Sequence, residues 1–145
     1  MARRIAQLDR FRACRQANSA VEFALVLPIF VAMLFGILIY GSYFALTHSL
    51  QQLAAEAARR SVAGISDTER TSLAVDYIKK AATSYFMVDP HQLSVDAAAS
   101  PSDSNNFIVT LRYDASDSFF NFLPHIVPAP SPNIVRTAVI PRGGY

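Results

Sequence analysis

The chain has 145 residues, of which 52% are hydrophobic and 17% charged. This length excludes a large multidomain assembly, because one hydrophobic core takes roughly 100–150 residues. The formal net charge of +2 comes from five arginines among the first 17 residues, since the remainder has eight basic and ten acidic residues, and this excludes a basic surface for a nucleic acid partner.

Residues 23–46 follow this basic segment and contain no charged side chain. A helix of that length extends roughly 36 Å, which is enough to cross a hydrocarbon core of about 30 Å. A cleaved secretory signal has a shorter apolar core of about 7 to 15 residues. We therefore expect a single transmembrane helix in contact with membrane lipid.

The arginines also predict the orientation of this helix. Positive residues are enriched on the cytoplasmic side of a membrane span, and here all five arginines of residues 1–17 precede the span. Residues 1–17 are therefore interpreted as a basic cytoplasmic leader. The chain is expected in the inner (cytoplasmic) membrane as a single-pass protein, with residues 65–145 in the periplasm.

The apolar pattern changes after the span to helical spacings of three and four. The residues in this stripe are Leu46, Leu50, Leu53, Ala54, Ala57, Ala58 and Val62. The spacing predicts that the spanning helix continues as an amphipathic helix to about Ala63, where Gly64 ends it. Glu56 and Arg60 are expected to form an i,i+4 ion pair. We therefore predict one helical segment over residues 18–64.

The rest of the sequence predicts a small α+β domain over residues 65–145. Ser66 or Asp67 can cap a second helix, with Tyr85 on its apolar face and its end before Pro90. Alternating patterns over residues 93–96, 107–113 and 134–140 predict three strands of an antiparallel sheet. Cys14 is the only cysteine, so no disulfide can stabilise this domain, which must pack on the emerging helix or on partner subunits.

A carboxylate stands immediately before the span, at Glu22. A charged residue at the centre of a bilayer costs about 2.5–3.5 kcal/mol and less near the interface. Taken alone, Glu22 either marks the wetted cytoplasmic interface or has a function that repays this cost. The residues around it decide between these two interpretations.

The stretch from Ala17 to Phe23 resembles the start of the TadE-like family, the minor pseudopilins of Tad (tight adherence, Flp-type) pili. In that family a basic leader ends in a small residue, usually glycine, and four residues then precede a glutamate and an aromatic residue. Here Ala17 takes the small position, four residues from Asn18 follow, and Glu22 and Phe23 complete the motif. The likeness continues through Leu27-Pro28 and residues 53–60.

This resemblance implies processing and assembly sites. A prepilin peptidase would cleave between Ala17 and Asn18, and Glu22 and Phe23 would act in assembly. The implied function is that of a minor pseudopilin that helps to initiate or prime a Tad/Flp-type IV pilus. Its implied partners are other pseudopilins, the major Flp-type pilin and an inner-membrane assembly platform. TadE-like and TadF-like roles both remain open, and the alternative is a signal-anchored periplasmic binding module outside any filament.

An enzyme is not expected. His48, His91 and His125 lie in three separate segments without a second ligand at metal spacing, and no P-loop, nucleophile elbow or dinucleotide motif is present. We therefore predict no catalytic residue, no metal site and no cofactor.

Overall fold

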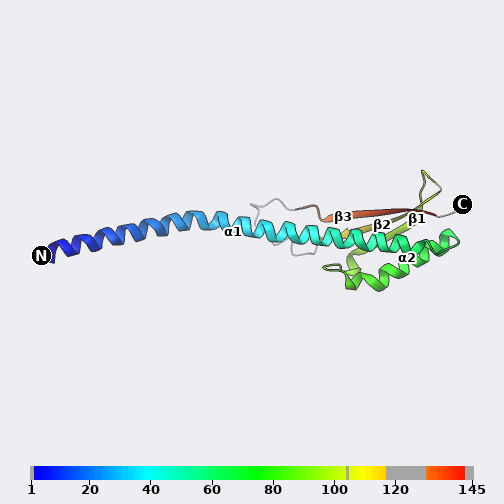
Figure 1. Ribbon diagram of the computed structural model, residues 1–145, viewed down its shortest axis with the longest axis horizontal. Helices are drawn as coiled ribbons and strands as arrows, with labels where there is room; N and C mark the ends of the chain where they lie inside the picture. Colours follow the sequence, from blue (N-terminus) through cyan, green and yellow to red (C-terminus); the bar gives the residue numbers. More distant parts are fainter. Residues whose placement is uncertain (1, 104, 117–129, 143–145) are drawn as a thin grey trace. The chain divides into compact units, whose positions relative to one another are not determined.

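The computed structural model describes residues 2–103, 105–116 and 130–142, with side chains from Ser19 onward. It contains two helices, α1 (Ala2–Ser61) and α2 (Asp67–Ala81), and two short 3-10 turns, η1 (Ala82–Ser84) and η2 (Pro90–Gln92). The strands are β1 (Leu93–Ala99), β2 (Asn106–Asp114) and β3 (Asn133–Pro141) (Figure 1). The α+β prediction is therefore confirmed. The chain divides into two compact units, Met1–Leu38 and Ile39–Tyr145, and α1 contributes to both.

Helix α1 differs from the expected helix at both ends. It begins at Ala2 rather than at residue 18, because alanine, arginine, leucine and glutamine in the basic segment are all good helix formers. It ends at Ser61, two residues earlier than expected. The N–H groups of Val62 and Gly64 donate to the carbonyl groups of Arg59 and Ser61, so tighter three-residue turns replace the last helical turn.

The three strands form one antiparallel sheet in the order β1-β2-β3. Leu111 in the central strand pairs with Val95 on β1 and with Arg136 on β3. The side chains of β2 alternate between buried and partly exposed, so one face of the sheet is covered and the other is open. All three predicted strands are confirmed, and each is longer than its sequence pattern.

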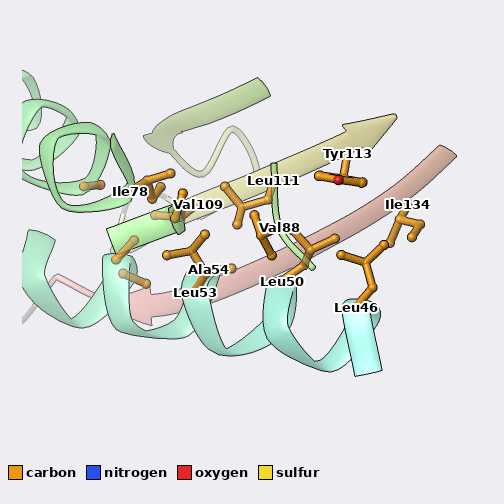
Figure 2. Close-up of a cluster of buried hydrophobic side chains, with 14 of the residues drawn as sticks. Leu46, Leu50, Leu53, Ala54, Ile78, Val88, Val109, Leu111, Tyr113 and Ile134 are labelled. Atoms are coloured by element: carbon orange, nitrogen blue, oxygen red, sulfur yellow. The ribbon is translucent and has the colours of Figure 1, made fainter. Parts of the chain in front are cut away.

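Both helices cover the same face of the sheet in the unit Ile39–Tyr145. Leu46, Leu50 and Leu53 of α1 are at most 1% exposed. Figure 2 shows these leucines pointing toward Leu111 and the other core side chains of the sheet, with Ile78 of α2 completing the cluster. The expected packing of the domain on the emerging helix is confirmed. Val62, predicted as part of the same stripe, is 40% exposed because it lies beyond the helix end.

The corner between α1 and α2 depends on a glycine. Arg70 donates from Nε to the Gly64 carbonyl oxygen at 2.9 Å, and a Cβ at position 64 would lie 2.8 Å from the backbone nitrogen of Arg70. Ser66 is the N-cap of α2, since its hydroxyl oxygen accepts from the Glu69 N–H at 3.2 Å. The Glu69 carboxylate in turn accepts from the Ile65 N–H at 2.9 Å. The sequence left Ser66 and Asp67 as alternatives, and the structure assigns the cap to Ser66.

The ion pair of Glu56 and the position of Tyr85 differ from the predictions. Glu56 forms its ion pair with Arg59, at 2.9 Å, and not with Arg60. Arg60 instead lies over the ring of Tyr77, 5.4 Å from its centroid. Tyr85 was expected on the helix but lies after η1, where the hydrogen bond with the Tyr77 hydroxyl, together with burial, raises the pKa of Tyr85 to about 12.

The packing of α1 on the sheet predicts different effects for two leucine substitutions in the same helix. Leu50→Ala should lower the free energy of unfolding of the unit Ile39–Tyr145 by about 2–5 kcal/mol, because it leaves a cavity at a fully buried position. Leu38→Ala is the matched control, since Leu38 is 56% exposed and should change that free energy by less than about 0.5 kcal/mol. Hydrogen exchange of the β2 amides in the detergent-solubilised chain measures both effects. Equal protection in the two variants would contradict this core.

Candidate functional site: Glu22 and the apolar helix

The sequence-predicted site residues all lie on one continuous helix. Ala17, Asn18, Glu22 and Phe23 are within α1, and the side chains of the first two lie outside those described. Asn18 precedes Glu22 by four residues, which places the two positions about one helical turn apart on the same face. The helix thus brings the expected cleavage site and the carboxylate together.

The apolar side chains that follow are exposed around the whole helix. Phe23, Ile29 and Ile37 are 65%, 72% and 62% exposed. Exposure of apolar surface to water is unfavourable by about 25 cal/mol per Å². This part of α1 therefore needs lipid or other protein around it, in contrast to the leucines at positions 46, 50 and 53.

Length and hydropathy make this helix suitable for a membrane. Over the described residues, one helical stretch, Ser19–Ser61, contains an 18-residue window of mean hydropathy 2.6 with only 6% of it buried. A soluble core helix of equal hydropathy would be mostly covered by its own fold. The predicted membrane anchor therefore has the required helix.

Glu22 is the only charged side chain among residues 19–38, and it is exposed. It lies at the start of the apolar stretch, where α1 passes from polar to uncharged sequence. A carboxylate in this position is well suited to meet a cation from a neighbouring chain, because it is exposed at the point where the apolar surface begins. Phe23 follows it with an exposed ring.

Three residues in the apolar part of α1 bear on how the helix can pack. Pro28 has no N–H, so the Ala24 carbonyl group has no donor at the usual i+4 position, and the helix can bend there. Gly36 has open space around the position of a Cβ, so the chain's own packing does not require glycine there. Ala32 and Gly36 together make a small-xxx-small pair of the kind that allows close helix contact in membranes.

The structure shows no alternative centre for metal chemistry among the residues it describes, where no three His, Cys, Asp or Glu side chains gather. The ring of His48 forms a hydrogen bond with Gln52 at 2.8 Å, and His91 belongs to η2. His125 lies outside the described residues.

Comparison with protein families identifies one segment of the chain. The family model described as TadE-like protein matches residues 18–59. The resemblance to TadE-like proteins is confirmed over these residues. The TadE-like match begins at the residue after Ala17, includes Glu22 and Phe23, and continues through most of the leucine and alanine stripe. It implies an association with Tad pilus systems in general. No curated protein and no solved structure matches the chain.

The structure also contains a groove that the sequence analysis did not predict. A groove of about 310 Å³ lies between α2 and β1 and has mostly apolar walls, including Ile78, Leu93 and Val95. Its two sides come from different segments with different periodicities, so no single pattern could indicate it. Only the packing of α2 beside the strand brings these side chains together.

Proposed function

We propose that the protein is a minor pseudopilin of a Tad/Flp-type IV pilus assembly system, which helps to initiate or prime the pilus at the inner membrane. The observation that carries this proposal is Glu22, a single exposed carboxylate at the start of an exposed apolar helix within a TadE-like segment. The proposed topology places residues 1–17 in the cytoplasm and the sheet in the periplasm, as the arginine distribution predicts.

Processing would create a positive charge close to Glu22. Cleavage by a prepilin peptidase between Ala17 and Asn18 removes the five arginines of the leader and leaves a positively charged amine on Asn18. Glu22 of one subunit then pairs with the amine of an adjacent subunit. An unpaired carboxylate is unfavourable in a low-dielectric environment, so this pair fixes the register between neighbouring helices.

The exposed helix surface supplies the rest of the contact. Ala32 and Gly36 allow a neighbouring helix to approach closely, and Pro28 lets α1 adapt its direction when it leaves lipid for a bundle. The proposed partners on this surface are other pseudopilins and the major Flp-type pilin, with an inner-membrane platform as the assembly machine. A signal-anchored binding module would need the apolar helix but neither Glu22 nor removal of the leader.

Topology is tested by a fusion. Alkaline phosphatase joined after Gly64 should be active, because the enzyme folds only when it is exported and the arginines hold residues 1–17 in the cytoplasm. A matched fusion after Gln16 should be inactive. A stable but inactive fusion after Gly64 would contradict the proposed orientation.

The role of Glu22 is tested by removing its charge. Glu22→Ala should leave membrane insertion unchanged or slightly favoured, since a carboxylate opposes transfer to lipid. Co-purification with pseudopilin partners should fall by about tenfold or more, because the neighbour's amine loses its partner in a low-dielectric contact.

The control is Asp96→Ala, which removes an exposed carboxylate from β1 and should leave co-purification unchanged. Both variants are compared with the natural chain at equal abundance in the membrane. Undiminished association and normal piliation in Glu22→Ala would return Glu22 to the role of an interface marker and refute the proposed mechanism.

A further inference from the structure

The sheet has two outer edges, β1 and β3, whose backbone groups are not used by β2. Ser100 donates its N–H to the Asn106 carbonyl at 2.9 Å, which fixes the alternation along β1. The even-numbered residues of β1 therefore bond to β2, and the N–H and C=O groups of the odd-numbered residues 93–99 point away from the sheet. The same alternation leaves the odd-numbered residues 133–141 of β3 pointing outward.

Two outward carbonyl groups on the edge of β3 are capped by side chains. Gln51 of α1 donates from Nε2 to the Thr137 carbonyl at 3.4 Å, and Arg136 donates from Nη1 to the Val135 carbonyl at 2.8 Å. Pro141 has no N–H to offer at the end of the strand. These are features that prevent an edge strand from pairing with another chain.

On the edge of β1, two outward groups are capped, one on either side of Val95. Thr71 of α2 donates its hydroxyl to the Ala97 carbonyl at 2.9 Å, and the Leu93 N–H donates to the Pro90 carbonyl. Between them, the N–H and C=O of Val95 form no hydrogen bond with any described residue. Together with the Leu93 C=O and the Ala97 N–H, they make a short backbone-binding site.

The groove between α2 and β1 lies beside these same backbone groups. Leu93 and Val95 form its strand side, and Val75, Ile78 and Ala82 form its helix side. Its volume of about 310 Å³ is sufficient for one or two aliphatic side chains. Free backbone groups and an apolar groove therefore coincide at Val95.

One charged residue, Lys79, is among those that line the groove. Lys79, in the last turn of α2, is exposed and lines the opening. No described carboxylate forms an ion pair with it. An ammonium group at the mouth of an apolar groove favours a ligand that brings a carboxylate to that end.

From this geometry we infer that β1 binds an extended segment of a partner polypeptide, which adds as a fourth strand through Val95 and places apolar side chains in the groove and a carboxylate near Lys79. Peptides that extend a sheet in this way take affinity from backbone hydrogen bonds and specificity from a groove that receives alternate side chains. An extended segment matches Val95 because its own backbone N–H and C=O groups are free to pair. This inference is independent of the pilus assignment, because it uses no residue of the apolar helix.

The test uses the full chain in lipid nanodiscs and a short fluorescent peptide of alternating threonine and valine that ends in glutamate. Fluorescence polarisation should show saturable binding. The same peptide with N-methylated valines should not bind, because it keeps the side chains but loses backbone donors. Equal binding of the N-methylated peptide, or no binding of the unmodified one, would overturn the inference.

Three substitutions test where on the chain the peptide binds. Val95→Pro removes an outward N–H without breaking the ladder to β2, and it should weaken binding at least about fivefold. Val139→Pro makes the same change on the edge of β3, away from the groove, and should leave affinity unchanged. Lys79→Glu should weaken binding of the peptide that ends in glutamate, and this loss should shrink at high salt.

Thermal melts check that the variants are folded. If Val95→Pro does not fold, binding of the N-methylated peptide to the natural chain decides whether backbone pairing is needed. Equal loss in Val95→Pro and Val139→Pro would overturn the assignment to β1. Self-association of the unliganded chain that disappears in Val95→Pro would assign the edge to a second copy and also overturn the inference.

Discussion

The packing of the C-terminal part of α1 against the sheet is the contact on which the unit Ile39–Tyr145 depends. Leu46, Leu50 and Leu53 are almost fully buried among side chains of β2 and β3, and no disulfide is possible with a single cysteine. A three-stranded sheet and one short helix have little apolar surface to bury without this support. The helix that continues from the apolar stretch is thus also one wall of the core.

This arrangement explains why the same helix has two kinds of apolar pattern. Residues 21–38 have large exposed apolar side chains on every face, as a helix in lipid or in a bundle of helices requires. From Leu46 onward the apolar residues form a stripe, because only one face meets the sheet. Glu22 stands at the beginning of the first pattern, and the TadE-like match covers both.

Much of this fold could be predicted from the sequence, because each main element has a strong period. The leucine stripe, the Ser66 cap and the three alternating strands all correspond to structure. The errors lie where local patterns compete with tertiary contacts. Arg60 meets the Tyr77 ring instead of Glu56, and α2 ends at Ala81, so that Tyr85 leaves the predicted helix.

The functional residues likewise include some that the sequence predicts and some that it does not. Glu22 and Phe23 could be found because they form a short motif with fixed spacing before an uncharged stretch. The edge of β1 could not, because its free groups at Val95 and the groove beside them arise only when α2 packs next to the strand. The bonds from Thr71 to Ala97 and from Gln51 to Thr137 join distant segments, and no local period records them.

The central claim is that this helix belongs to a processed pseudopilin and not to a permanent anchor. Mass spectrometry of the mature protein, purified from membranes of cells with a Tad pilus system, tests this most directly. The account predicts an N-terminus at Asn18 with a free amine, and loss of that species when the prepilin peptidase is absent. Recovery of the chain with residues 1–17 still attached, in cells whose major pilin is fully processed, would contradict it.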